Sequence, residues 1–103
     1  MRRVIVRYTV KPDQVASNEE LVRAVYEELD RTAPAGLRYA TFKLEDGVSF
    51  VHIASVDTAD GRNPLAEVEA FARFQKDIAA RCDEAPVATE MHEVGSYRFF
   101  GGE

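Results

Sequence analysis

Residues 37–56 read LRYATFKLEDGVSFVHIASV, which is two runs of alternating apolar and polar residues on either side of Asp46-Gly47. Alternation with a period of two is typical of a β-strand. Asp-Gly between two such runs is a strong hairpin signal, because a type I′ turn needs a positive φ at both central residues. We therefore predict antiparallel strands over 37–45 and 48–56 that are joined by a two-residue type I′ turn.

The two faces of this predicted hairpin differ in character. A two-residue turn places Phe42 opposite Val51 and Thr41 opposite His52. One face is then almost purely apolar and consists of Ala40, Phe42, Leu44, Val51 and Ile53. The other face is mixed and consists of Tyr39, Thr41, Lys43, Phe50, His52, Ala54 and Val56.

A strand and a helix precede the hairpin. Residues 3–10 alternate and are rich in β-branched side chains, which predicts a strand that ends before Pro12. Residues 14–31 carry one apolar stripe at helical spacing, which predicts a helix ended by Pro34-Ala35-Gly36. Ser17 with Glu20 fits a capping box, so a start of the regular helix at Asn18 stays open.

A second helix and a last strand follow the hairpin. Asn63 and Pro64 are typical of an N-cap and a first helical position. The predicted helix continues to Cys82, with an inner stripe of Val68, Phe71, Ala72, Gln75, Ile78, Ala79 and Cys82. Residues 83–86 should end it, and a strand should run over 87–100, with Gly95 bending or bulging it.

The order β-α-β-β-α-β predicts an α+β, ferredoxin-like fold with a four-stranded antiparallel sheet. Two helices cover only one face of such a sheet. The other face then carries apolar surface that a monomer does not normally expose to water. We therefore expect a homodimer, with Ala40, Phe42, Leu44, Val51 and Ile53 at its interface.

Composition narrows the class of protein. The chain has 103 residues, which corresponds to one domain over residues 1–103. Its net charge of −5 argues against a nucleic-acid partner, which needs a basic stripe. A single cysteine excludes an internal disulfide, and no apolar run is long enough to span a membrane. The start lacks the apolar core of a signal peptide, which predicts a cytoplasmic protein.

His52 is the main candidate for chemistry. A neutral imidazole can accept a phenolic proton at physiological pH, so this residue could act as a catalytic base. The alternative is a half-buried histidine whose nitrogens are satisfied by Thr41 or Tyr39, because no orienting carboxylate is visible. Around it we expect a ligand site formed by six aromatic or polar side chains: Tyr8, Tyr39, Thr41, Phe50, Phe71 and Gln75.

Metal binding has little support in the sequence. Glu90 and His92 share one face of the predicted last strand and could ligate a divalent cation. A solvated strand end explains the same alternation. The chain has two histidines without a recognisable ligand spacing, so we predict no metal and no cofactor.

Three segments resemble the antibiotic-biosynthesis-monooxygenase-like family. They are VIVRYTVKP at 4–12, GLRY at 36–39 leading into FVHI at 50–53, and AFARFQ at 70–75. The resemblance implies a ferredoxin-like fold that pairs sheet to sheet as a dimeric α/β barrel. It also implies that Val56 faces a cavity under the helices, together with Tyr39, Phe50, His52 and Ala54.

Function follows less directly from this resemblance. Some members oxidise aromatic polyketides without a cofactor, and others degrade haem with an asparagine, a tryptophan and a histidine. Those three positions hold Val6, Val56 and Gln75 here, and the chain has no tryptophan. We therefore predict a dimer that binds a small aromatic or hydrophobic metabolite between sheet and helices. The alternative is a cofactor-independent monooxygenase that acts on an aromatic or quinone-like substrate.

Overall fold

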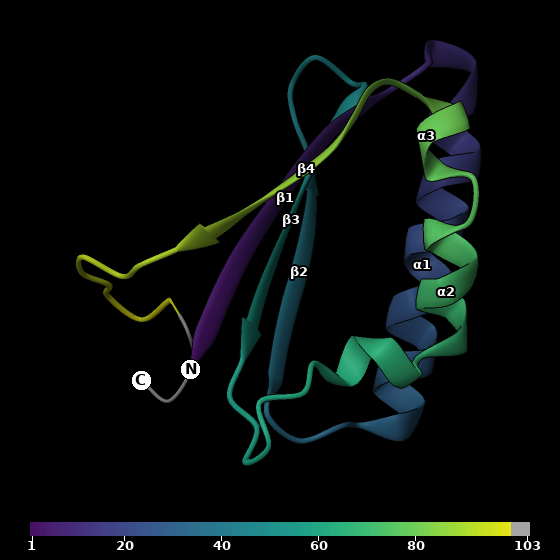
Figure 1. Cartoon of the computed structure of the whole chain (residues 1–103). Helices are drawn as coiled ribbons and strands as arrows, with labels where there is room; N and C mark the ends of the chain where they lie inside the picture. Colours follow the sequence, from purple (N-terminus) through teal and green to yellow (C-terminus); the bar gives the residue numbers. More distant parts are fainter. Residues whose placement is uncertain (100–103) are drawn as a thin grey trace.

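One antiparallel sheet carries the architecture, with its strands in the order β2-β3-β1-β4. The computed structural model describes residues 1–99. Within them the strands are β1 (Arg2–Val10), β2 (Leu37–Lys43), β3 (Ser49–Val56) and β4 (Cys82–Met91). All three strand pairs are antiparallel, and the helices pack on one face of the sheet (Figure 1). The α+β, ferredoxin-like fold is therefore confirmed.

The first helix starts earlier than the capping box suggested. A short 3-10 turn, η1 (Pro12–Gln14), leads directly into α1 (Val15–Thr32), and no side-chain cap precedes α1. The alternative start at Asn18 is therefore wrong. At the other end Ala33 adopts the left-handed conformation with a φ of 44°, and its N–H donates to the carbonyl of Leu29.

The second helix is broken rather than continuous, which corrects the prediction. It consists of η2 (Pro64–Glu67), α2 (Glu69–Gln75) and α3 (Ile78–Arg81). Asn63 does cap the start, since its side chain accepts from the N–H of Leu65. Val68 and Lys76 are extended, and Asp77 is left-handed with a φ of 59°.

These breaks change the helical phase. Ala70 and Phe74 are buried, whereas Ala72, Gln75 and Ala79 are exposed. The predicted inner stripe was therefore wrong at those three exposed positions, because it assumed one unbroken helix.

The last strand begins five residues before its predicted start, because β4 starts at Cys82 rather than at residue 87. Phe100, its predicted end, lies outside the described residues, and Gly95 lies beyond the strand. Pro86 is tolerated within β4 because β4 is an edge strand. The register places Ala85 and Pro86 together opposite Tyr8, which is a β-bulge.

The hairpin has the predicted register but a different turn. Thr41 pairs with His52, and Phe42 pairs with Val51. Gly47 has a φ of 78°, but Asp46 does not share the positive φ that a type I′ turn needs. Instead, Oδ1 of Asp46 accepts from the backbone N–H groups of Val48 and Ser49. The carboxylate of Asp46 thus fixes a wider loop.

The mixed face of the hairpin is the one that packs beneath the helices. Phe50, His52 and Val56 are buried, and Tyr8 on β1 joins them in the core. Phe42, on the opposite face, is 50% exposed. No helix within residues 1–99 combines the length and the apolar character needed to cross a membrane.

Candidate functional site

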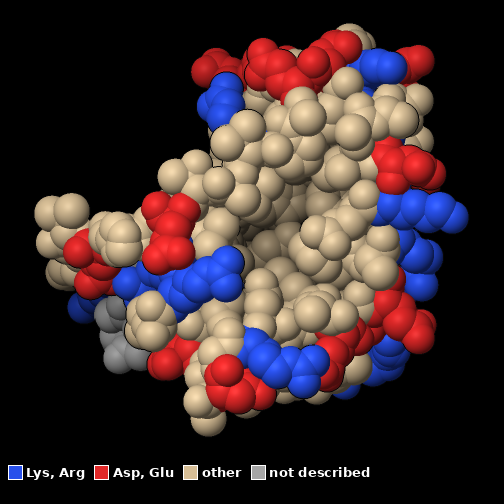
Figure 2. All heavy atoms as spheres, in the orientation of Figure 1, with Lys and Arg blue, Asp and Glu red and all other residues tan. Residues whose placement is uncertain are grey.

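A cavity of about 460 Å³ lies between the sheet and the helices. In Figure 2 this face of the molecule is hollowed, and the hollow is lined by uncharged residues with charged groups around its rim. Ligand sites in proteins have volumes of roughly 300–1,000 Å³ and are mostly apolar. The lining side chains are Arg2, Val4, Val6, Tyr8, Tyr39, His52, Ala54, Asn63, Leu65, Phe71, Phe74, Gln75, Ile78, Pro86 and Ala88.

His52 is the centre of a hydrogen-bonded cluster at the wall of this cavity. Its Nε2 lies 2.7 Å from the hydroxyl of Tyr8, and its Nδ1 lies 2.5 Å from the hydroxyl of Tyr39. Thr41 Oγ1 lies 3.1 Å from the same Nδ1 and 2.7 Å from the hydroxyl of Tyr26. Both ring nitrogens therefore have protein partners.

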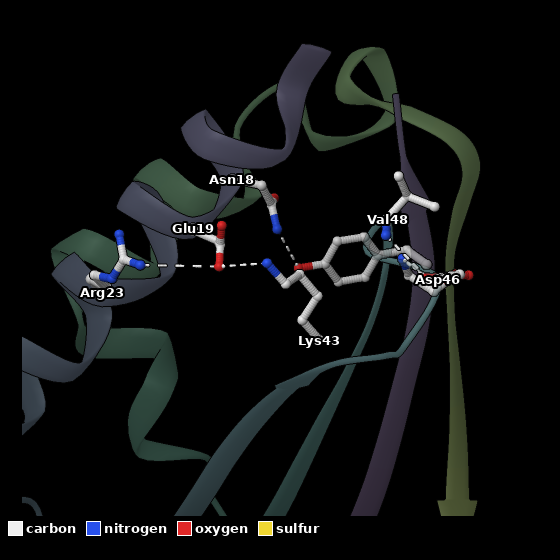
Figure 3. A network of polar contacts seen from close by, with 8 residues as sticks. Asn18, Glu19, Arg23, Lys43, Asp46 and Val48 are labelled. Carbon is white, nitrogen blue, oxygen red and sulfur yellow. Dashed lines mark hydrogen bonds and ion pairs between the residues drawn. The ribbon is translucent and has the colours of Figure 1, made fainter. Parts of the chain in front are cut away.

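The cluster continues from the sheet into the helices. Nδ2 of Asn18 donates to the Tyr8 hydroxyl over 2.9 Å, and Asn18 is completely buried. In Figure 3 Asn18 points from α1 toward the sheet, beside the Lys43–Glu19 ion pair. Nη2 of Arg81 lies 3.4 Å from Oδ1 of Asn18.

The buried charge of Arg81 is balanced without a carboxylate. Its Nη2 donates to the carbonyl of Phe74 over 2.6 Å, and its Nη1 donates to the carbonyl of Lys76 over 3.0 Å. These carbonyls end α2, where the helix dipole favours a cation. The guanidinium carbon also lies 5.5 Å from the centre of the Phe74 ring. Arg81 therefore holds Asn18 while it closes the broken helix.

Burial controls the protonation of the cluster. Desolvation lowers the pKa of His52 to about 4, so its imidazole is neutral at physiological pH. Desolvation also raises the pKa of Tyr8 and of Tyr39 well above the ordinary value for a phenol. All three side chains are therefore neutral. A neutral His52 with so low a pKa is a weak proton acceptor but a good hydrogen-bonding group.

Stacked rings fix the hydroxyl groups in place. The rings of Tyr26 and Tyr39 stack with centroids 5.4 Å apart, and those of Tyr8 and Phe50 stack at 5.5 Å. The rings of Phe71 and Tyr39 are nearly perpendicular, with centroids 6.3 Å apart. Such pairs stabilise by roughly 0.5–1.5 kcal/mol beyond their buried area. These ring contacts therefore support the hydroxyl groups of the cavity wall from neighbouring elements.

The structure brings most of the predicted site residues together. His52, Tyr8, Tyr39 and Phe71 line the cavity, and Gln75 lines it while remaining exposed. The other two predicted ligand residues do not reach it. Thr41 lies behind His52, and Phe50 is 2% exposed beneath Tyr8.

Asn18 and Arg81 belong to the hydrogen-bonded cluster, and neither of them was identified from the sequence. An asparagine in the first turn of a helix normally faces solvent, and the sequence pattern predicts Arg81 within one continuous helix. Position 18 does lie on the same stripe as Val22 and Val25, at spacings of four and seven. That spacing was the available signal for burial.

Glu90 and His92 do not form a common site. Glu90 lies on β4 with its carboxylate 3.8 Å from Arg2, whereas His92 is exposed beyond the end of the strand. Within residues 1–99 no three histidine, cysteine or carboxylate side chains gather as a metal site would require.

The outer face of the sheet carries the five residues expected at a dimer interface. Phe42 is half exposed, and the other four are partly buried: Ala40, Leu44, Val51 and Ile53. Val87 on β4 adds a side chain that is 64% exposed. This face is not covered by the helices (Figure 1).

Solved structures share the fold of this chain. An antibiotic biosynthesis monooxygenase aligns with a TM-score of 0.73 and 24% identity, covering 92% of this chain and all (100%) of that chain. A putative antibiotic biosynthesis monooxygenase from Nitrosomonas europaea aligns with the same TM-score of 0.73, 17% identity and coverages of 92% and 100%. The resemblance seen in the sequence is thus confirmed as a shared fold.

One similar structure is described by its chemistry. SnoaB from Streptomyces nogalater, a cofactor-independent oxygenase, aligns with a TM-score of 0.67 and 16% identity, covering 92% of this chain and 94% of that chain. Another protein of Nitrosomonas europaea with this fold is described as of unknown function. It aligns with a TM-score of 0.71 and 15% identity, covering 93% of this chain and 91% of that chain. No family model and no curated protein matches the chain.

The residues present do not fit a haem group. Both nitrogens of His52 are engaged with Tyr8 and Tyr39, so neither has a free lone pair directed into the cavity. Val6 and Gln75 also line the cavity, and neither side chain is a ligand for haem iron.

Proposed function

We propose that this chain binds a small, flat and largely apolar molecule with one polar edge in the cavity between sheet and helices. The supporting observation is the apolar cavity whose wall carries the hydrogen-bonded Tyr8, His52 and Tyr39. A few fixed polar groups on an apolar wall are how small-ligand sites orient their ligands.

Binding is better supported than turnover. Acid–base catalysis is most efficient when the pKa of the base lies near the operating pH, and the pKa of about 4 makes His52 a weak base near neutral pH. An imidazolium at this buried position would need a stabilising carboxylate. The described partners of both ring nitrogens are hydroxyl groups instead. The alternative is an oxygenase reaction on an aromatic or quinone-like substrate, and measurement of oxygen consumption distinguishes it from simple binding.

The test is a thermal-shift screen with aromatic ketones, quinones and phenols, followed by calorimetric titration of the compounds that raise the melting temperature. Tyr39→Phe removes a hydroxyl that lines the cavity, whereas Tyr26→Phe removes one that bonds Thr41 outside it. We expect only Tyr39→Phe to weaken binding, by about tenfold. Equal effects of the two variants, or no binding by the wild type, would contradict the proposal.

Turnover is measured in the same samples. If the wild type consumes oxygen with a bound aromatic compound and His52→Ala does not, the oxygenase function replaces simple binding. We expect no oxygen consumption by either protein.

We also propose that the chain forms a homodimer through the outer face of the sheet. Large apolar side chains are exposed on this face and on the segment after β4: Phe42, Val87, Val94, Tyr97 and Phe99. Large apolar side chains exposed in this number favour an interaction surface. A second copy of the chain would cover it without closing the cavity, which lies on the opposite face of the sheet.

A further inference from the structure

We infer that Asn18 and Arg81 set the direction of the hydrogen-bond chain, so that His52 carries its proton on Nδ1 and Tyr39 offers a donor to the cavity. The bound molecule would therefore have an acceptor, such as a carbonyl oxygen, at its polar edge. The second statement rests on the proposed function, whereas the first concerns the protein alone.

The first step is the orientation of the Asn18 amide. A guanidinium only donates, so the atom that faces Arg81 must be the oxygen Oδ1. The Nη2 of Arg81 is itself fixed by the carbonyl of Phe74 at 2.6 Å. The nitrogen Nδ2 of Asn18 consequently faces Tyr8 and donates to its hydroxyl oxygen.

The second step is the hydroxyl proton of Tyr8. Its oxygen already accepts from Asn18, and the side chain is 1% exposed. Among the described residues, the acceptor that remains for this proton is Nε2 of His52 at 2.7 Å. If Nε2 carried a proton instead, the Tyr8 hydroxyl would have two donors and its own proton would be buried without an acceptor.

The third step is the tautomer of His52. A neutral imidazole has one N–H, so an accepting Nε2 places the proton on Nδ1. That N–H donates to the hydroxyl of Tyr39 at 2.5 Å and reaches Thr41 at 3.1 Å. The Tyr39 oxygen then acts as an acceptor toward His52, and its own proton points elsewhere.

The last step concerns what a ligand meets. The Tyr39 proton can go to Thr41, whose oxygen already lies 2.7 Å from the Tyr26 hydroxyl, or to a molecule in the cavity that Tyr39 lines. A carbonyl oxygen is the better acceptor for it, because a phenolic ligand oxygen accepts more weakly and brings a proton of its own that needs a further acceptor. Asn18 and Arg81 are positioning residues in this scheme because they act through Tyr8 and His52.

The tautomer is measured by ¹⁵N NMR of the full chain labelled at its two histidines, with His92→Gln to assign the signals. We expect the wild type to show the Nδ1–H form of His52. Asn18→Asp keeps the shape and a partner for Arg81, but its carboxylate accepts from Tyr8, so we expect the Nε2–H form in that variant. An Nε2–H form in the wild type, or an unchanged tautomer in a folded Asn18→Asp protein, would overturn the first statement. If the variant does not fold, the wild-type spectrum alone decides.

The ligand class is measured by calorimetric titration with 1-tetralone, 1-naphthol and tetralin, which share a bicyclic skeleton. We expect 1-tetralone to bind about tenfold more tightly than the other two, and Tyr39→Phe to abolish that preference. Binding of all three with equal affinity, or a preference for 1-naphthol, would overturn the acceptor-edged ligand while sparing the proposed cavity. If none of the three binds, the proposed ligand binding in the cavity is contradicted, and the NMR spectra would still decide the tautomer.

Discussion

The hydroxyl oxygen of Tyr8 lies 2.7 Å from Nε2 of His52, although 44 positions separate the two residues in the chain. The sheet explains this contact. Tyr8 pairs with Phe50 and Val6 pairs with His52 across neighbouring strands, so the two side chains are diagonal neighbours on one face. The polar wall of the cavity is thus built on paired strands rather than on loops.

Removing the Tyr8 hydroxyl should destabilise the protein. Tyr8→Phe keeps the ring stacked on Phe50 but leaves Asn18 Nδ2 and His52 Nε2 buried without their partner. We expect the free energy of unfolding to fall by about 1–3 kcal/mol in urea denaturation. The matched control is Tyr97→Phe, whose side chain is 80% exposed and which should change stability by less than about 0.5 kcal/mol. Equal losses in the two variants would mean that the buried cluster contributes nothing.

Stability should depend on pH through His52. The pKa falls from 6.5 in the unfolded chain to about 4 in the folded protein, so the unfolded state binds more protons between these values. The contribution of neutral His52 is therefore complete above pH 6.5 and is lost as the pH falls toward 4. The loss amounts to about 3 kcal/mol, since one pKa unit corresponds to about 1.4 kcal/mol.

The measurement is urea denaturation of wild type and His52→Gln at several pH values. Carboxylates titrate in both proteins, so the difference between the two isolates the histidine. We expect the wild type to lose its advantage over the variant on acidification. Parallel pH profiles would show that His52 has an ordinary pKa.

Gly36 should not tolerate a side chain. It has a φ of 79°, and an added Cβ would lie 2.6 Å from the carbonyl oxygen of Asp57 and 2.8 Å from Cγ2 of Thr58. We expect Gly36→Ala to cost at least about 2–3 kcal/mol by thermal or urea unfolding. Gly61, with a φ of 74° and open space around it, is the matched control, and Gly61→Ala should cost only about 1 kcal/mol. Similar losses would show that backbone strain alone matters.

Charge on the outer face should break the proposed dimer. Phe42→Asp places a carboxylate at a half-exposed apolar position of that face. We expect light scattering to report a dimer for the wild type and a monomer or insoluble protein for the variant. Ala72→Asp, at an exposed position of α2, should leave the dimer intact. A monomeric wild type at micromolar concentration would contradict the proposal.

The fold could be predicted from the sequence wherever one local pattern determines it. The hairpin alternates over two full strands, so a slip of one residue would exchange the face that packs beneath the helices with the outer face. The break at Asp77 and the early start of β4 depend instead on individual side-chain contacts and on the position of the strand in the sheet. Arg81 binds the carbonyls that end α2, and an edge position in the sheet accommodates Pro86. Such contacts leave no local periodicity to detect.

The candidate site could be predicted in part for the same reason. Tyr39 and His52 lie on the two strands of one hairpin, so the register of the hairpin places them on the same face. Asn18 and Arg81 meet across 63 positions and two helices, and their contact depends on how those helices pack. The polar side chains on the strands could thus be predicted from the sequence, but the hydrogen-bond network that orients them could not.

The most direct test of the central claim is calorimetric titration of the tightest-binding aromatic compound against wild type, Ala54→Phe and Ala80→Phe. Ala54 lines the cavity on β3 and is no partner of His52, so a larger ring there would occupy the cavity, whereas Ala80 is exposed on α3 and is not part of the lining. We predict that Ala54→Phe abolishes binding and that Ala80→Phe leaves it unchanged, with both proteins folded. Undiminished binding to Ala54→Phe would place the ligand elsewhere and would contradict the account.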